Sequence, residues 1–372
     1  MDILLPHASD EGADPALQSA LAMCQVAAGD LAAAILTFQA GLARMPDDFS
    51  SRLAYAECLD RAGDSSAALP EYFRAVHEAQ RRGRWLNDAT TIPALRARVQ
   101  RAMNRIDQGR QALFERVLQP HIDTFGRDAM ARVAEALHVY LGSRRPPARD
   151  PRQQPKFFWM PGLAPTPFYP RLPWYDGLEA AASCIKEELD AVLNAERELV
   201  PFLVIDDQNA EEDYLGGDPH SRAWDAFFFY RHGQQYTGQH TACPRTSAAL
   251  EDVPLTRIAG HAPEVLFSLL APRTHIKPHY GVTNTRVVTH LPLVIPAGDC
   301  KLVVGGIEHA WNAGRCVTFD DTFLHEAWNR TDERRVVLIL DTWNPDLAPE
   351  ECVALKDLVE RIGEFNARAG IS

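Results

Sequence analysis

Three features that would direct the interpretation elsewhere are missing from this sequence. No apolar run is long enough to cross a bilayer, and the first residues do not show the charged-then-apolar order of an export signal. The seven cysteines are scattered and never form a Cys-x-x-Cys pair, which favours reduced thiols used as small apolar residues. We therefore expect a soluble, cytoplasmic protein without a membrane span.

Positive charge is also scarce. The 38 lysines and arginines are outnumbered by 50 acidic residues, which gives a net charge of −12. A general nucleic-acid binder would need a surplus of cations to neutralise phosphates, so the net charge argues against this class. Hydrophobic residues make up 46% of the 372 positions, which is enough for two domains or for one large domain with an appended helical region.

The region 1–142 contains an internal repeat. Gly29-Asp30 followed by two alanines recurs as Gly63-Asp64 followed by two alanines, a shift of 34 residues. This period resembles tetratricopeptide repeats, in which each unit is a helical hairpin. Two units are too few for a stable array, so a helical stretch from about 90 to 142 is expected to continue or cap the stack. The region is either a platform for a protein partner or a packing module.

Residues 143–175 have a different character. Nine prolines leave no room for a regular helix, so this stretch is predicted to be an extended connector. Its aromatic residues suggest that its second half packs onto the following domain, 176–372. That domain is expected to begin with a helix from 176 to about 197 and to close with a helix from 350 to 367.

Between these two helices the period changes to that of strands. Short apolar or alternating runs are separated by turn signals, with no helices between them, which is typical of a double-sheet jelly roll. The predicted fold is therefore α+β, with all-α helical repeats followed by a cupin-like double-stranded β-helix. The predicted strands are 226–230, 265–270, 286–295, 301–304, 316–319 and 335–340.

Two histidines carry the strongest functional signal. His279 follows a proline at a turn, and His325 follows two aspartates in a loop between predicted strands. Ligands at strand ends that face a barrel interior can converge on one ion, and imidazole suits iron, copper, nickel or zinc. The usual non-haem iron triad adds a carboxylate two residues after the first histidine, but Gly281 stands there. Either waters complete the site or an acid from elsewhere does, with Asp320 and Asp321 as nearby supports.

A buried cation is expected beside this pair. Arg335 opens a strand whose alternate residues share one face, and a guanidinium inside a dry barrel needs an anion such as a dicarboxylate. Ser268 lies on an apolar strand and can donate to the same carboxylate. Arg286 and His290 share a face of another strand, so they are candidates for binding a carboxylate of co-substrate or substrate.

The segments around these residues resemble the aspartyl/asparaginyl β-hydroxylase family. The resemblance lies in 266–279, 281–286, 290–296 and 319–329 with 341–345, and it covers roughly 156–348. It implies a jelly roll that uses iron(II), oxygen and 2-oxoglutarate, and it implies that the triad carboxylate is absent, as at Gly281.

The resemblance also assigns roles to individual residues. It implies that His279 and His325 are the iron ligands, that Arg335 and Ser268 hold the distal carboxylate of 2-oxoglutarate, and that His290 lies near its other end. Arg335 thus counts among both the catalytic and the cofactor-binding residues.

Substrate recognition is less closely matched. Val288 replaces a second arginine that animal members of the family carry two residues after the one matching Arg286. Arg245, in Cys243-Pro244-Arg245-Thr246, resembles a family element expected to line the substrate entrance.

The most favoured activity is hydroxylation of Cβ in an aspartyl or asparaginyl residue of a peptide or protein. The alternatives are a hydroxylase of a lipid or small metabolite, a cupin-type metalloenzyme without 2-oxoglutarate, and a non-catalytic metal-binding scaffold.

Overall fold

The computed structural model of the chain describes residues 15–147, 149–195, 197, 199–202, 215–216 and 223–371. The chain divides into two compact units, 1–119 with 361–372 and 120–360. The divisions after residues 119 and 360 differ from the boundaries at 142 and 175 that composition suggested. Both divisions fall inside continuous helices, where composition gives no signal. The helices concerned are α6 (Pro93–Phe125) and α12 (Pro349–Arg368).

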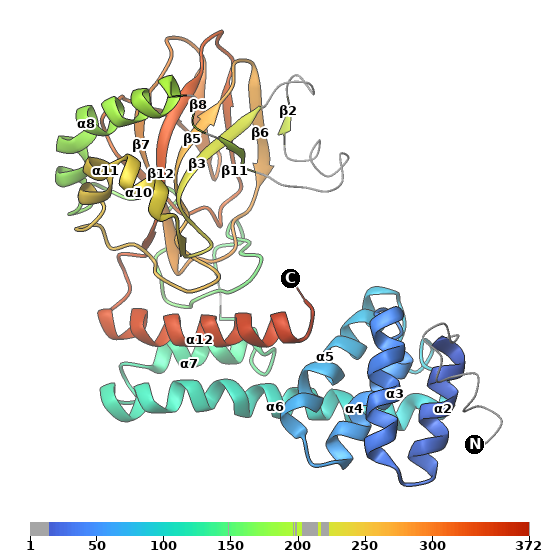
Figure 1. Cartoon of the computed structure of the whole chain (residues 1–372). Coiled ribbons are helices and arrows are strands. Elements are labelled where there is room, and N and C mark those ends of the chain that lie inside the picture. The colour runs from blue at the N-terminus through green and yellow to red at the C-terminus, as the bar shows by residue number, and fades with distance from the viewer. Residues whose placement is uncertain are drawn as a thin grey trace. The chain divides into compact units, whose positions relative to one another are not determined.

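The first unit is helical, as the sequence predicted (Figure 1). The two glycines of the repeat have left-handed φ angles of +83° and +89°, and the aspartate after each one caps the next helix. The two caps lie 34 positions apart, at Asp30 and Asp64, so the repeat in the sequence is a repeat of helix starts. Its helices, besides the first part of α6, are α2 (Pro15–Ala27), α3 (Leu31–Arg44), α4 (Phe49–Arg61) and α5 (Ser65–Arg81).

Small residues allow these helices to pack closely. Ala22, Ala34, Ala56 and Ala68, two equivalent pairs of the repeat, are at most 1% exposed. A side chain at Gly109 on α6 would place its Cβ 2.6 Å from a methyl group of Leu69 on α5. Close approach of the backbones at these small residues therefore complements the large side chains of this core, such as Phe38, Leu53 and Trp85.

The second unit contains two antiparallel sheets within its described residues. One has the order β1-β3-β5-β12-β7-β10 with β4 beside β3, and the other has the order β2-β6-β11-β8-β9. The strands are β1 (Val200–Pro201), β2 (Leu215–Gly216), β3 (Trp224–Arg231), β4 (Gln234–Gln235), β5 (Val265–Leu270), β6 (Thr274–His279), β7 (Arg286–Val294), β8 (Cys300–Val304), β9 (Ile307–Ala310), β10 (Val317–Phe319), β11 (His325–Asn329) and β12 (Arg335–Trp343).

The order of β5 to β12 identifies the fold. Strands β5, β12, β7 and β10 are neighbours in the larger sheet, and β6, β11, β8 and β9 are neighbours in the smaller one. Successive strands thus cross between the sheets except at the β8–β9 hairpin, which is the double Greek key of a jelly roll. The predicted fold class is confirmed.

Helices cover the outer face of the larger sheet in this unit (Figure 1). The apolar side of α8 (Tyr175–Asn194) packs with Phe267 and Leu338 on that face, as do residues beside α10 (Thr237–Ala242) and α11 (Pro244–Ala249). The alternate positions Ser268 and Ile339 lie on the other face, toward the smaller sheet. The sheet is therefore apolar on both faces, and polar residues on its inner face are candidates for function.

The proline-rich connector is held against the barrel of this unit. The amide of Gln154 donates to the carbonyl of Thr322, and the amides of Phe157 and Phe158 donate to that of Val282. The connector is followed along the chain by α8 and preceded by α7 (Ala131–Tyr140). Among the described residues no helix has the length and apolar character needed to cross a membrane.

Candidate active site

The two predicted metal ligands lie directly opposite each other on neighbouring strands. His279 is the last residue of β6 and His325 the first residue of β11, and the two are paired in the sheet register. Their rings are 4.0 Å apart between centroids. The sequence had suggested a turn and a loop for these histidines; both are instead strand ends, where backbone pairing fixes their separation.

The second ring nitrogen of each histidine is occupied. Nδ1 of His279 lies 2.8 Å from the carbonyl of Lys277, and Nδ1 of His325 lies 3.1 Å from that of Phe323. Donation from Nδ1–H fixes the tautomer in which Nε2 carries a lone pair. Burial lowers the pKa of His279, and burial with the neighbouring imidazole lowers that of His325 to about 4. Both rings are therefore neutral, the form that binds metals.

Gly281 stands at the position where a third ligand would be expected. The carboxylate of Asp321 occupies the space that a side chain at this position would need. A Cβ built on Gly281 would lie 2.1 Å from the carboxylate carbon of Asp321 and 2.3 Å from each of its oxygens. The amide of Gly281 also donates to the backbone carbonyl of Asp321 at 2.7 Å. The acid next to the histidine pair thus comes from four residues before His325 instead of two residues after His279.

The two neighbouring aspartates have different tasks. Asp320 accepts hydrogen bonds from the amide and hydroxyl of Thr322 and from the side chain of Gln153, so it ties the loop to the connector. Asp321 contacts Arg286 at 3.0 Å through Oδ2, while its buried Oδ1 has no hydrogen-bond partner among the described residues. Of the two supports suggested by the sequence, Asp321 is the one at the site.

Arg335 is a buried cation that has no carboxylate beside it among the described residues. It is 1% exposed, and within the described part of the chain its Nε and Nη1 atoms have no hydrogen-bond partner. Its guanidinium carbon lies 5.0 Å from the centre of the Trp311 ring, and burial lowers its pKa to about 10. A charge in this position calls for an anion in the barrel.

Further donors accompany this arginine. The indole N–H of Trp311 and Nδ1 of His290 are also buried, with no partner in the described residues. The ring of His290 is stacked 6.0 Å from that of Trp311. Ser268 is fully buried on β5 and accepts a hydrogen bond from Trp224 at 2.9 Å. Trp311 was not anticipated, because one tryptophan between turn residues has no distinctive pattern.

A row of aromatic and imidazole rings leads from Arg335 and Trp311 to the histidine pair. From His290 the row passes to Phe319 at 5.1 Å and on to His325 at 5.7 Å. Burial lowers the pKa of His290 well below its usual value, and the charge of Arg335 adds to this effect. The imidazole between the two sites is therefore neutral.

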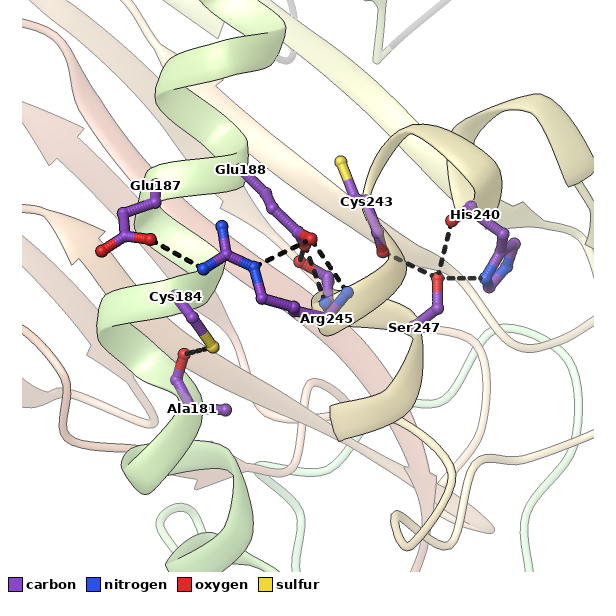
Figure 2. A network of polar contacts seen from close by, with 9 residues as sticks. Ala181, Cys184, Glu187, Glu188, His240, Cys243, Arg245 and Ser247 are labelled. Atoms are coloured by element: carbon purple, nitrogen blue, oxygen red, sulfur yellow. Dashed lines mark hydrogen bonds and ion pairs between the residues drawn. The ribbon is translucent and has the colours of Figure 1, made fainter.

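Two predicted substrate residues are engaged by other side chains. Arg286 contacts Asp321 at 3.0 Å and Asp341 at 3.2 Å, and these two charges outweigh burial and raise its pKa. Arg245 lies on α11 across the sheet from the barrel interior, and α11 packs against α8 (Figure 2). There it contacts Glu187 at 2.7 Å and Glu188 at 3.3 Å. The structure brings Arg286 to the histidines and keeps Arg245 away from them.

The barrel thus brings together two facing, neutral imidazoles and a buried arginine that has no carboxylate beside it among the described residues. Residues 179–345 match the family model described as aspartyl/asparaginyl beta-hydroxylase. Among the described residues there is no group of three or more His, Cys, Asp and Glu side chains placed to hold a metal.

Similar proteins agree with this family model. The chain is 31% identical over 247 residues to aspartate beta-hydroxylase domain-containing protein 2 of Rattus norvegicus, covering 64% of the chain and 68% of that protein. It is 33% identical to the human aspartyl/asparaginyl beta-hydroxylase, covering 47% of the chain and 21% of that protein. It is also 33% identical to an ornithine lipid ester-linked acyl 2-hydroxylase of Rhizobium tropici, covering 49% of the chain and 61% of that protein. The chain belongs to the aspartyl/asparaginyl β-hydroxylase family.

Proposed function

We propose that this protein is an Fe(II)- and 2-oxoglutarate-dependent oxygenase that hydroxylates Cβ of an aspartyl or asparaginyl residue in a peptide or protein. One observation carries the proposal: Arg335 is buried in the barrel with unpartnered N–H groups, in a row of rings that leads to a pair of neutral imidazoles. A metal site alone has no use for such a cation, whereas a dicarboxylate co-substrate needs both groups.

The residues present suit ferrous iron. The Nε2 atoms of His279 and His325 are the two protein ligands, and their orientation is set by the backbone carbonyls that accept from Nδ1. The free Oδ1 of Asp321 lies beside the space where a side chain at position 281 would stand, so it is placed to accept a hydrogen bond from a water bound to the metal. Two protein ligands leave several positions open, as an oxygenase requires.

The residues also suit 2-oxoglutarate. Its distal carboxylate is expected to pair with Arg335, with the indole N–H of Trp311 and the hydroxyl of Ser268 as further donors. His290 stands between this carboxylate and the histidine pair, where its neutral ring can donate to the co-substrate. The carboxylate would neutralise a buried charge that has no partner now, which adds binding energy.

Iron and co-substrate would supply the oxidising power. With both bound, O₂ and 2-oxoglutarate would yield succinate and carbon dioxide, and one oxygen atom of O₂ would enter succinate while the other would enter the C–H bond of the substrate. The chain itself holds the imidazoles in the metal-binding tautomer, fixes the dicarboxylate by one end, and keeps water away with the apolar residues between the sheets.

A lipid substrate is the second candidate. Val282 and Leu324 lie within three residues of the histidines, and each is 42% exposed despite being a large apolar side chain. Exposed apolar groups beside a catalytic site suit an acyl chain, and one similar protein is named as a hydroxylase of a lipid acyl group. Both substrate classes therefore belong in the first assay.

The experiment is to load the purified protein with Fe(II) and follow the conversion of 2-oxoglutarate to succinate, with aspartyl- and asparaginyl-containing peptides and with acylated ornithine lipids as substrates. We expect stimulated succinate release with a peptide and a hydroxylated product in its mass spectrum. Succinate release only with the lipids would replace the substrate assignment. No turnover of 2-oxoglutarate by folded, iron-loaded protein with any substrate would contradict the proposal.

Variants test the assigned roles in the same assay. His279→Ala is expected to lose iron and turnover together, by about 100-fold or more in iron affinity. His275→Ala is the matched control, because His275 is on the same strand and pairs with Glu326 at 36% side-chain exposure. Arg335→Lys is expected to need much more 2-oxoglutarate, because an ammonium cannot reproduce the two-pronged contact. Unchanged co-substrate affinity in that variant would remove Arg335 from the site.

A further inference from the structure

Two adjoining cavities lie in the first compact unit. Their volumes are about 820 and 730 Å³, and both are lined by Asp60, Tyr72, Arg105 and Gln108, so they form one continuous groove. Its lining residues belong to α4, α5 and α6, with further residues from α2 and from the last part of α12. We call it the arginine groove. Nothing in the proposed hydroxylation uses it.

The groove is basic although the chain is acidic. Its lining includes only three acidic side chains, Glu57, Asp60 and Glu364, whereas the whole chain has a net charge of −12. Such a separation of charge produces a local positive potential that attracts anionic partners. Seven arginines line it, namely Arg61, Arg98, Arg101, Arg105, Arg116, Arg361 and Arg368.

The acidic residues of the lining are already paired. Glu57 contacts Arg98 at 2.7 Å, and Asp60 contacts Arg105 at 2.5 Å. Glu364 contacts Arg361 at 2.7 Å.

Four arginines of the lining lie outside these ion pairs, and two of them, Arg116 and Arg368, each donate to a backbone carbonyl. Arg61 and Arg101 are exposed, and in the part of the chain that the structure describes neither has an ion-pair partner. Arg61 on α4 and Arg101 on α6 are therefore the cations placed to pair with acidic groups of a ligand.

Apolar side chains lie among these charges. Tyr72 and Phe365 are lining residues that are largely buried, at 6% and 4% exposure, and Met23 on α2 is 45% exposed. An occupant that meets both kinds of surface must carry acidic groups and apolar groups along its length. Such a large groove is also too long for a single small anion.

We propose that the arginine groove binds an extended acidic segment of a partner protein, with its carboxylates on Arg61 and Arg101 and its apolar side chains over Tyr72 and Met23. A nucleic acid is disfavoured because its uninterrupted phosphates would also meet Glu57, Asp60 and Glu364. This binding does not depend on the proposed hydroxylation.

The test uses the full-length protein without iron or 2-oxoglutarate. Fluorescence anisotropy is measured with a labelled peptide in which glutamate and leucine alternate, and with matched peptides that carry glutamine or lysine in place of every glutamate. A labelled single-stranded oligouridylate is the competing probe. We expect binding of the glutamate peptide alone, weakening as salt is added. Equal binding of the glutamine peptide, preference for the oligonucleotide, or no binding would each overturn the proposal.

Charge reversal locates the binding. Arg61→Glu combined with Arg101→Glu is expected to lower the affinity for the glutamate peptide by about tenfold or more, since attraction is replaced by repulsion. Arg84→Glu is the matched control, because Arg84 is exposed on the same unit and does not line the groove. Circular dichroism checks that each variant folds. Equal losses in the double variant and in the control would assign the binding to general charge and contradict the proposed site.

Discussion

Two arginines inside the same barrel have opposite surroundings. Arg286, on β7, contacts the carboxylates of Asp321 and Asp341. Arg335, on β12, is more deeply buried, and within the described residues it has no carboxylate beside it. A buried charge without a partner costs several kcal/mol, roughly, whereas a paired one holds its neighbours in place. Arg286 is therefore part of an ion-pair network beside the histidines, whereas we propose that Arg335 binds a ligand.

The same contrast separates the adjacent aspartates. Three donors satisfy Asp320, and burial raises its pKa to about 6. Asp321 keeps a free oxygen beside the histidine pair. In both pairs of residues, the member with incomplete hydrogen bonding is the one that faces the proposed chemistry.

The largest difference is expected when the charges of Arg286 and Arg335 are removed one at a time. Arg286→Met is expected to lower the free energy of unfolding by about 3–5 kcal/mol, because it leaves Asp321 and Asp341 buried without their cation. Arg335→Met is expected to leave stability unchanged or to raise it by about 1–4 kcal/mol, because it removes an unpaired buried charge. Urea unfolding of the protein without ligands measures both. Equal losses would mean that Arg335 has a structural partner.

A second test concerns the carboxylate that fills the space beside Gly281. Gly281→Ala is expected to cost about 1–3 kcal/mol, because the added methyl group collides with the carboxylate of Asp321. Combining it with Asp321→Ala removes the collision. The double variant is therefore expected to lose less stability than the sum of the losses in the two single variants. Thermal unfolding of the three variants measures this coupling. Strict additivity would show that the two positions do not share the space.

The smallest expected effect concerns the indole beside Arg335. Trp311→Phe keeps the aromatic ring but removes the N–H group, and it is expected to weaken 2-oxoglutarate binding by about tenfold, the equivalent of one charge-assisted hydrogen bond. Calorimetric titration of the metal-loaded protein measures it, with Trp328→Phe as control, since the indole N–H of Trp328 donates to Asp299 instead. Equal affinities in the two variants would remove the Trp311 N–H from the site.

Much of the fold could be predicted because its signals are local. The glycine-aspartate pairs of the repeat are helix-start signals, and the apolar runs became β3, β5, β7, β8, β10 and β12. Strands β6, β9 and β11 were missed because their residues are mixed. In β6, for example, the buried Thr274 and Ile276 alternate with the half-buried His275 and Lys277, and an exposed proline follows. Antiparallel pairing with neighbours, instead of intrinsic preference, makes these segments strands.

The site was predictable in its residue types but not in its pairing. Sequence placed His279, His325 and Arg335 in one cluster. The sheet register pairs the two histidines, and a row of ring contacts leads from Arg335 to His325. It did not show that Arg286 is paired with two carboxylates, or that Arg245 lies against α8 on the outer face. Ion pairs between residues far apart in the chain leave no local pattern, so they become visible only when the fold brings them together.

The most direct test of the account is an anaerobic titration of the Fe(II)-loaded protein with 2-oxoglutarate, followed by visible absorption. We expect a charge-transfer band in the native protein. The Arg335→Met variant is expected to need about 100-fold more 2-oxoglutarate than the native protein to give the same band. A folded, iron-loaded protein that shows no band, or an Arg335→Met variant with the native requirement, would contradict the assignment of the barrel to iron and 2-oxoglutarate.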